Sequence, residues 1–456
     1  MLYVLLAVVV GIFVFSMIVN KVFSNTYAID DMFVPMYEQQ IATLDLTKAE
    51  DAEIYVQLQS AVDVSKEAKE LNLDYNSPEG YYFYNDYEEL IEKYYTTKYL
   101  EKNEEAAEQV RLAKEEAKAK FSNFDWKKYI QDKIDTYNIS LQGEMTDSER
   151  DVINETVKVL QYRIDNNIPF TNGAGSEELD QYIGSYAQYS QMNKDDKAYV
   201  NRNELLAKKQ VEKSVEEGKY KLEHKLFKDT KDYNTAQGLF LEQFMSLSMF
   251  VSICIFMIAG SIVAEEFNKG TIKQLLIRPF TRSKILVSKM IATFISVLAF
   301  VVVLSTLLCV LGGLFTGTFG TLVEPIVHYN LNTGSIVVTN TITEALIHFA
   351  AILPEIIILI MFTILASTIT GNTALSVILG FVVIFAPQLF SGLIDRVRVL
   401  SFLPMYNWDL TQFLFGGLAT SKFLTLTKAI VVDIVTIVGL YIANILVFKK
   451  KDVKNQ

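Results

Sequence analysis

The chain has 456 residues, of which 50% are hydrophobic and 21% are charged, and its formal net charge is −11. This composition is too apolar for a soluble enzyme and too charged for a chain that lies wholly within a membrane. The stretch 24–238 holds 43 of the 53 acidic and 27 of the 42 basic residues, so the acidity belongs to this stretch and the remainder is net basic. We therefore expect two parts, and no nucleic-acid partner.

Six predominantly apolar runs, each with at most one charged residue, have the length of roughly 20 residues that crosses a hydrocarbon core. They are Leu2–Val22, Leu239–Ala264, Ile285–Leu314, Ala345–Ile369, Ala374–Ile394 and Ala429–Phe448. The sequence thus predicts an all-α fold: a polytopic membrane protein with six transmembrane helices plus a large helical extracellular domain.

The expected domains follow from these runs. Residues 1–23 form the first transmembrane helix, and residues 24–238 form the extracellular helical domain. Residues 239–448 form a five-helix transmembrane portion, with a cytoplasmic connector at 265–284 and an outer amphipathic segment at 396–428. Residues 449–456 form a basic cytoplasmic tail.

The orientation is predicted from the basic residues, because short cytoplasmic loops carry an excess of Lys and Arg. Such residues cluster in the connector and in the tail, whereas the loop 317–343 contains none. We expect a multi-pass protein of the cell membrane with both termini in the cytoplasm and residues 24–238 outside. Four basic residues contradict the rule, because Arg396, Arg398, Lys422 and Lys428 fall outside on this topology.

The outer domain is expected to be helical. Helical periodicity predicts helices over Asp30–Leu73 and Glu88–Phe121. Thr146 and Glu149 have the spacing of a capping box that opens a third helix. The Tyr-rich stretch from Gly80 onward is more typical of aromatic packing between helices than of a docking surface for an apolar peptide.

Catalytic motifs were not found, so we expect a chain that is not an enzyme and holds no cofactor. "GGLATSK" at 416–422 departs from a phosphate-binding loop, because Ser421 replaces the required Gly and Phe423 replaces the required Ser or Thr. His224, His328 and His348 are scattered along the sequence, without metal-ligand spacing. Cys254 and Cys309 both lie in predicted spans, where small apolar packing is their expected role.

The connector carries the most specific pattern. "EEFNKGTIKQLLIRPFTRSKILVSK" resembles the segment that follows the second span in type-2 permeases of ATP-binding-cassette exporters, E-x-x-x-G-T-x-x-x-L-x-x-x-P-x-x-R-x-x-x-x-x-x-K. The resemblance also covers the six spans, a short turn at "TGN" and the amphipathic segment before the last span. The residues that match this pattern are Glu266, Gly270, Thr271, Leu275, Pro279, Arg282 and Lys289. We add the adjacent Glu265 to the expected ATPase-coupling residues.

What this resemblance implies is a short connector helix that docks on a separate cytoplasmic ATP-binding subunit, which binds ATP and Mg²⁺. It also implies a second permease chain and contact with membrane lipid. The simpler interpretation is that the basic residues bind anionic headgroups. That interpretation explains the lysines but leaves the Glu265–Glu266 pair and the Gly and Pro positions unexplained.

Three acids lie within the predicted spans: Glu242, near the outer end of the second, Glu355 and Asp433. Glu355 follows Pro354 near the middle of the fourth span, where a charge costs at least about 2.5 kcal/mol. We expect Glu355 to face other helices and the span to kink at Pro354; both are candidates for the transport path, and a structural hydrogen bond is an equal alternative. Asp433 lies about a turn from the end of the last span, and we expect its side chain to extend to the surface.

The predicted function is the permease subunit of an ATP-driven exporter that moves an amphipathic substrate, such as a peptide, an antibiotic or a lipid-like molecule, out of the cell. The alternative is a membrane-anchored extracellular sensor or binding protein without transport. An ion-coupled transporter is less favoured, because internal repeats and several intramembrane charges would then be expected.

Overall fold

A computed structural model describes residues 7, 10–15, 27–74, 77–171, 174–199, 201–227, 235–245, 247–268, 280–390, 394, 397–419 and 421–451. The chain divides into two units. The membrane unit comprises Met1–Val14, Asn193–Glu217 and Thr235–Gln456, and the polar unit comprises Phe15–Met192 and Gly218–Asn234. Asn193–Glu217, part of the predicted outer domain, therefore groups with the membrane unit.

The polar unit is built from helices. They are α2 (Tyr27–Ile41), α3 (Ala49–Glu70), α4 (Pro78–Tyr82), α5 (Glu88–Tyr95), α6 (Glu104–Ala119), α7 (Trp126–Ser140), α8 (Asp147–Asp165) and α9 (Ala174–Gln191). Two π-helical turns, η1 (Phe83–Tyr87) and η2 (Thr96–Leu100), extend α4 and α5, and a 3₁₀ turn, η3 (Lys120–Asn123), follows α6.

Two predicted long helices were wrong, because local polar groups break each of them. The predicted helix Asp30–Leu73 is interrupted between α2 and α3, where the Asp45 carboxylate accepts hydrogen bonds from the backbone and hydroxyl of Thr47. The predicted helix Glu88–Phe121 is interrupted before α6, where Lys102 has a φ of 53° and Asn103 caps α6. The capping box of Thr146 and Glu149 is confirmed at the start of α8.

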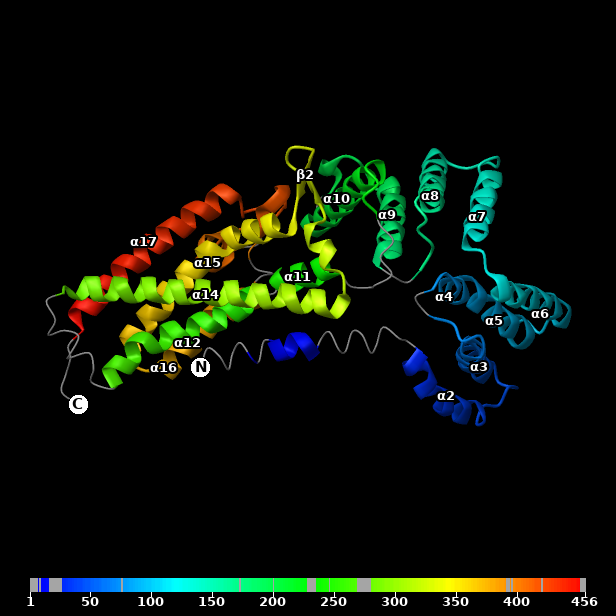
Figure 1. Ribbon diagram of the computed structural model, residues 1–456, viewed down its shortest axis with the longest axis horizontal. Coiled ribbons are helices and arrows are strands. Elements are labelled where there is room, and N and C mark those ends of the chain that lie inside the picture. The colour runs from blue at the N-terminus through cyan, green and yellow to red at the C-terminus, as the bar shows by residue number, and fades with distance from the viewer. Residues whose placement is uncertain are drawn as a thin grey trace. The chain divides into compact units, whose positions relative to one another are not determined.

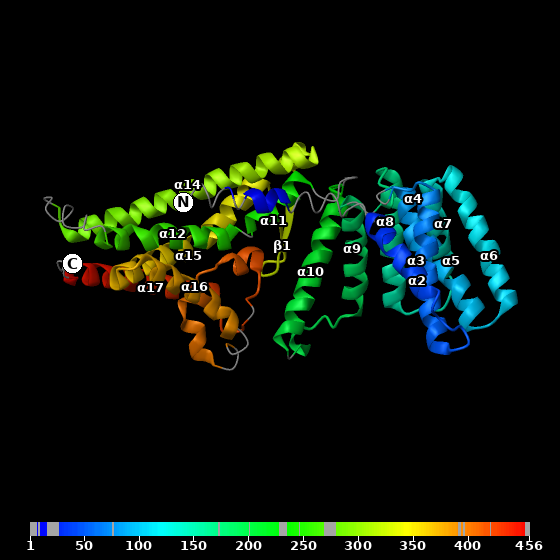
Figure 2. The same cartoon turned by 90° about the horizontal axis from the view of Figure 1, so that it is seen from below.

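The Tyr-rich stretch packs inside the polar unit. Phe83, Tyr87 and Ile91 are fully buried, against Val64 and Ala68 of α3. Figure 2 shows α3, α5 and α6 side by side in this unit. These contacts support the packing interpretation of the aromatic residues.

Arg163 of α8 is the largest fully buried side chain in the described part of the chain. Its guanidinium donates hydrogen bonds to the carbonyls of Pro169 and Ser176 and to the Asp180 carboxylate, 2.8 Å away. It also stacks on the Phe170 ring, with Cζ 4.2 Å from the ring centroid. Arg163 therefore joins α8, the segment after it and α9 through one buried charge.

The membrane unit contains a further set of elements. They are helical residues 10–15, η4 (Asp196–Ala198), α10 (Arg202–Glu223, which crosses into the polar unit after Glu217), α11 (Ala236–Met245), α12 (Leu247–Asn268), α14 (Arg282–Thr316), η5 (Phe319–Val323), β1 (Ile326–Asn330), β2 (Ser335–Thr339), α15 (Thr341–Thr370), α16 (Thr373–Phe390), η7 (Arg398–Phe402), η8 (Pro404–Tyr406), η9 (Thr411–Gly416) and α17 (Leu426–Lys450).

Four of the described helices are long and apolar enough to cross a membrane: α12, from Met249 to Glu266, and the whole of α14, α15 and α17. They run beside one another in Figure 1. The apolar part of α16, Thr373–Ala386, is shorter. Most of the predicted first span lies outside the described residues. The prediction of a mostly helical membrane protein is confirmed, whereas the count of six spans and the extracellular position of residues 24–238 stay predictions.

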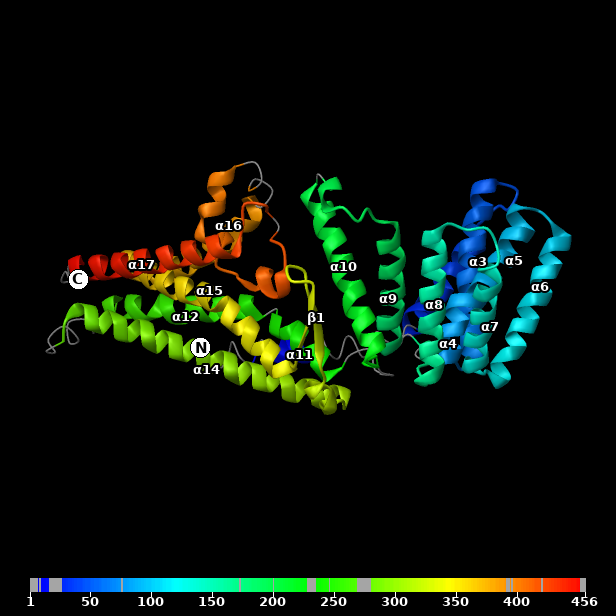
Figure 3. The same ribbon diagram turned by 90° about the horizontal axis from the view of Figure 1, so that it is seen from above.

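Helix α15 packs against α12, α14, α16 and α17. Ser367 connects it closely to α12, because its hydroxyl donates to the Gly260 carbonyl at 2.8 Å and accepts from the Ala264 backbone N–H at 3.0 Å. Small side chains allow such close approach between helices in a membrane. Figure 3 shows α12, α14, α15 and α17 from a second side.

Two loops differ in how well the sequence predicts them. The short "TGN" turn is confirmed, with Gly371 ending α15 at a φ of 63° and Asn372 accepting a hydrogen bond from Leu375. The loop 317–343 holds a hairpin that the sequence analysis did not foresee, in which β1 pairs antiparallel with β2, Ile326 opposite Thr339 and Asn330 opposite Ser335. The β-branched residues of this loop and Gly334, with a φ of 65°, explain the hairpin.

We predict that Arg163→Met lowers the free energy of unfolding of the polar unit by about 3–5 kcal/mol, because it leaves the Asp180 carboxylate and two carbonyls without their donor. Chemical denaturation of the full-length chain in detergent would measure this change. Arg150→Met, at an exposed position of the same helix, is the control. Equal stability of the two variants would contradict the role given to Arg163.

Candidate functional site

The predicted connector is described only at its two ends. Gly270, Thr271, Leu275 and Pro279 lie outside the described residues. Glu265 and Glu266 lie near the end of α12, with Glu265 exposed and Glu266 partly buried. Arg282 is the first residue of α14, and Lys289 lies two turns further along that helix.

The two ends of the connector meet at Lys289. Its ammonium forms an ion pair with the Glu266 carboxylate and donates a hydrogen bond to the Ile262 carbonyl at 3.0 Å. The side chains are 10% exposed for Lys289 and 23% exposed for Glu266. A pair this sheltered from water holds the last turns of α12 against the first turns of α14.

Arg282 makes a second attachment. Its guanidinium donates to the carbonyls of Lys449 and Lys451, at 3.0 and 3.2 Å, where α17 ends. The structure thus brings together Glu266, Lys289 and Arg282 at one end of the helices of the membrane unit, while Glu265 faces solvent.

Glu355 lies elsewhere, at the proline of α15. Its carboxyl group shares a hydrogen bond with Ser252 of α12 and lies close enough to Asp409 for the two charges to interact. Pro354 is within α15, and the neighbouring Ala351 carbonyl accepts a hydrogen bond from the Leu410 backbone N–H at 3.2 Å. The loop before α17 therefore supplies a donor where the proline interrupts the helical pattern.

An apolar groove of about 220 Å³ lies between α14 and α15. Its lining consists of Met290, Ile291, Phe294, Ile357, Ile360 and Met361. Met290 follows Lys289 directly, so the groove begins beside the ion pair at the connector.

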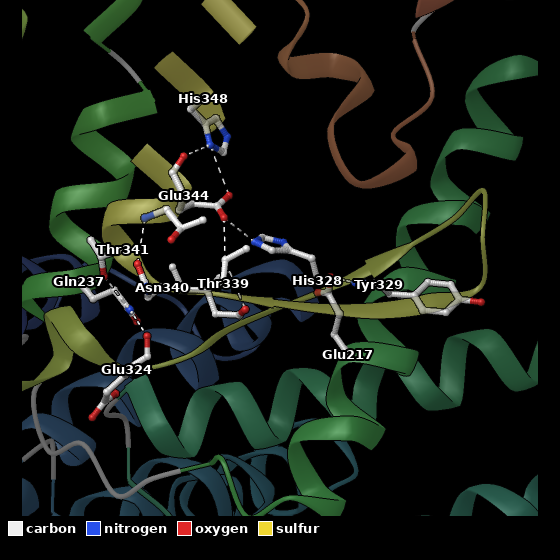
Figure 4. Close-up of polar contacts among 12 residues, drawn as sticks. Glu217, Gln237, Glu324, His328, Tyr329, Thr339, Asn340, Thr341, Glu344 and His348 are labelled. Atoms are coloured by element: carbon white, nitrogen blue, oxygen red, sulfur yellow. Dashed lines mark hydrogen bonds and ion pairs between the residues drawn. The ribbon is translucent and has the colours of Figure 1, made fainter. Parts of the chain in front are cut away.

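A polar cluster that sequence reasoning missed surrounds Glu344, in the first turn of α15 (Figure 4). The Glu344 side chain is 1% exposed, and its Oε2 contacts His328 Nε2 at 3.0 Å and accepts from the Thr339 hydroxyl at 2.8 Å. His348 Nδ1 lies 3.3 Å from Oε1. His328 and His348, which are scattered along the sequence, thus meet at one carboxylate, and the spacing of four residues between Glu344 and His348 on one helix was the signal.

The same cluster connects the hairpin to its neighbours. The His328 ring stacks on Phe415 of η9, with centroids 3.8 Å apart and an interplanar angle of 7°. The adjacent Tyr329 backbone donates to the Glu217 carboxylate of α10 at 2.8 Å, as Figure 4 shows. Gln237 of α11 bonds the Glu324 carbonyl and the Thr341 hydroxyl. Glu344 is therefore the buried centre of a junction between α15, the hairpin and η9.

The expectation for Asp433 was wrong. Its side chain is 2% exposed, and neither carboxylate oxygen has a hydrogen-bond partner among the described residues. Asp433 shares one side of α17 with the buried residues Ala429, Asn444 and Phe448, and this side packs on the bundle instead of facing the surface.

The predicted amphipathic segment 396–428 forms short 3₁₀ turns, η7 to η9, over the part that is described. Its centre is Asn407, fully buried, whose amide donates to the carbonyls of Ser401 and Leu403. Lys428 of α17 donates to the Ser401 hydroxyl and to the Phe423 carbonyl at 3.1 Å. Three of the four basic residues that conflicted with the charge rule have local partners, because the cationic groups of Arg398 and Lys422 also lie over the Phe423 ring.

Over the described ranges, no group of three or more His, Cys, Asp or Glu side chains is arranged to hold a metal ion.

We predict that Glu344→Leu speeds hydrogen exchange of the hairpin amides, residues 326–339, by about tenfold or more, because Thr339 and His328 lose their buried acceptor. Exchange of the purified chain followed by mass spectrometry would measure this. Glu344→Gln keeps an acceptor oxygen and should give a smaller effect. Leu346→Ala, at a position 63% exposed, is the control, and hairpin exchange equal to that control would contradict the prediction.

Comparison with known proteins agrees with a membrane location. The chain is similar to the uncharacterized protein YhcI of Bacillus subtilis (strain 168), with 26% identity over 242 residues, which cover 52% of this chain and 74% of YhcI. It is also similar to the uncharacterized membrane protein YdbK of the same organism, with 29% identity over 215 residues, which cover 46% of this chain and 80% of YdbK. No solved structure matches.

The four long apolar helices and the similarity to a membrane protein indicate a multi-pass membrane protein. Residues 213–454 match the family model described as "Protein of unknown function (DUF2705)". This match covers just over half of the chain, including α11 to α17, and the chain belongs to the DUF2705 family.

Proposed function

We propose that this chain is the permease subunit of an ATP-driven exporter, which moves an amphipathic substrate out of the cell by means of a separate cytoplasmic ATPase. In this proposal the connector 265–284 faces the cytoplasm and docks on the ATPase, which binds ATP and Mg²⁺. A second permease chain completes the transporter, and residues 24–238 lie outside.

The observation that carries the proposal is the ion pair between Glu266 and Lys289. Both residues match the connector pattern of type-2 permeases, and they lie on opposite sides of the connector. A surface segment transmits force to the membrane only when its ends are fixed to the helices that must move. Because Lys289 also binds the Ile262 carbonyl, α12 and α14 would respond to the connector together.

The substrate class is supported by the groove between α14 and α15. Its six lining side chains are all apolar, and it lies beside the helix pair to which the connector is attached. An apolar portion of an amphipathic molecule fits such a surface by burial of hydrophobic area. Glu355, with Ser252 and Asp409, offers a polar group deeper along α15.

The proposal predicts that an ATP-hydrolysing protein contacts the connector. A photo-crosslinking amino acid in place of Leu275 should capture that protein in native membranes, whereas the same group in place of Thr333, in the hairpin turn, should not. Capture only of lipid at position 275 would contradict the proposal and favour the sensor or binding-protein alternative.

The ion pair has its own prediction. Glu266→Gln and Lys289→Met should each reduce permease-dependent ATP hydrolysis, because removing one partner of a sheltered pair costs about 1–3 kcal/mol. The exchange Glu266→Lys with Lys289→Glu should recover part of the activity. Lys284→Gln, at an exposed position of the same helix, is the matched control. Hydrolysis by the co-purified complex would be measured for each variant, and unchanged rates in both single variants would overturn the role of the pair.

A further inference from the structure

Helices α12 and α17 end where α14 begins, as Figure 3 shows near the C-terminus. The last carbonyl groups of a helix have no donors within the helix, and the negative end of the helix dipole lies there. Cationic side chains are therefore favourable partners at such ends. In this part of the protein, cations from other elements bond helix carbonyls at three places: at the ends of α17 and α15, and on α12 at a carbonyl six residues before its end.

The first cation is Lys289, which bonds the Ile262 carbonyl of α12. The second is Arg282, which bonds the carbonyls of Lys449 and Lys451 at the end of α17. The third is Lys451, which follows α17. Its ammonium donates to the carbonyls of Thr368 and Ile369 in the last turn of α15, at 3.2 Å for Ile369.

The contacts of Arg282 and Lys451 form a series, because both pass through the short stretch 449–451. The backbone of residues 449–451 accepts from Arg282, and the same short stretch carries the Lys451 side chain that bonds α15. A displacement of the first turn of α14 therefore acts on α17 directly and on α15 through Lys451. The connector reaches α14 at its first residue, Arg282.

The α15–α17 pair is also joined two turns earlier. The Asn444 amide donates to the Met361 carbonyl at 2.9 Å. Asn444 and Lys451 are seven residues apart, as are their acceptors Met361 and Thr368, so the two helices run parallel in one constant register. A pair of helices bonded at two levels moves as one body.

Among the consecutive lysines 449–451, only Lys451 is partly buried, since Lys449 and Lys450 are exposed. Burial lowers the pKa of the Lys451 ammonium, as expected for a cation held away from bulk water. Lys449 and Lys450 fit a simple role at anionic headgroups. Lys451, with two carbonyl acceptors on another helix, does not.

We infer that Arg282 and Lys451 act as positioning residues in series, which carry movement of the connector to the ends of α17 and α15. This inference rests on the proposed function for its meaning in transport, but the link itself is a property of the membrane unit alone. It extends the predicted coupling site from the connector to the basic tail.

The test compares two adjacent lysines in the full-length chain. Lys451→Gln should speed hydrogen exchange in the last turn of α15 by about tenfold, the size expected for loss of a charge-assisted hydrogen bond. Lys450→Gln removes the same charge from an exposed position and should leave that exchange unchanged. Equal exchange in the two variants would overturn the link, whatever the ATPase does.

Arg282 distinguishes a series from two independent contacts. Arg282→Gln should also speed exchange at the end of α15, and the double variant with Lys451→Gln should be no faster than Lys451→Gln alone. Multiplied effects in the double variant would show independent contacts and overturn the series.

Measurement of ATP hydrolysis by the permease with its co-purified ATPase separates this inference from the proposed function. With a co-purified ATPase, Lys451→Gln should keep ATPase binding and lose substrate-stimulated hydrolysis, whereas Lys450→Gln should keep both. If no ATPase co-purifies with the wild-type chain, the proposed function fails while the exchange measurements still decide the link. If the ATPase is present and Lys451→Gln retains full stimulation, the role of the link in coupling is overturned.

Discussion

A polar group placed in hydrocarbon costs free energy unless it finds a partner within the protein, and the surroundings of α15 in the membrane unit are organised around this constraint. Helix α15 shows it at three levels. At its start the buried Glu344 carboxylate binds Thr339 and contacts two histidines, and beside Pro354 the Ala351 carbonyl receives the Leu410 N–H. At its end the carbonyls of Thr368 and Ile369 receive Lys451. Apart from His348, which belongs to α15 itself, these partners come from other elements, so satisfying α15 also assembles the hairpin, the loop before α17 and the basic tail around it.

The sequence predicted the features that depend on long apolar runs and on strong local signals. The runs gave α12, α14, α15 and α17, and the Thr146–Glu149 spacing gave a capping box. Both signals are local: the length of an apolar run decides whether a helix can span, and a cap involves residues only three positions apart.

The features that sequence analysis missed depend on contacts between residues that are distant along the chain. Nothing in the sequence near Asp433 shows that its side of α17 is buried, and His328 meets Glu344 only because the hairpin folds back onto α15. The breaks at Asp45 and at Lys102 were missed for another reason. A single side-chain cap or one residue in the left-handed conformation ends a helix even where the apolar residues keep their helical spacing on both sides. The candidate site was predicted in part: Glu266, Arg282 and Lys289 lie together, and the role of Lys451 emerged only from the structure.

The proposed function gives the two ends of the membrane unit different tasks, with an ATPase at the connector end and the hairpin and Glu344 cluster on the other side. The most direct measurement of this claim is labelling of single added cysteines in intact cells with a membrane-impermeant maleimide. Thr333→Cys, in the hairpin turn, should be labelled from outside, and Lys284→Cys should be labelled only after the membrane is permeabilised, with the wild-type chain as the control for Cys254 and Cys309. Labelling of Lys284→Cys from outside, with Thr333→Cys protected, would contradict the account.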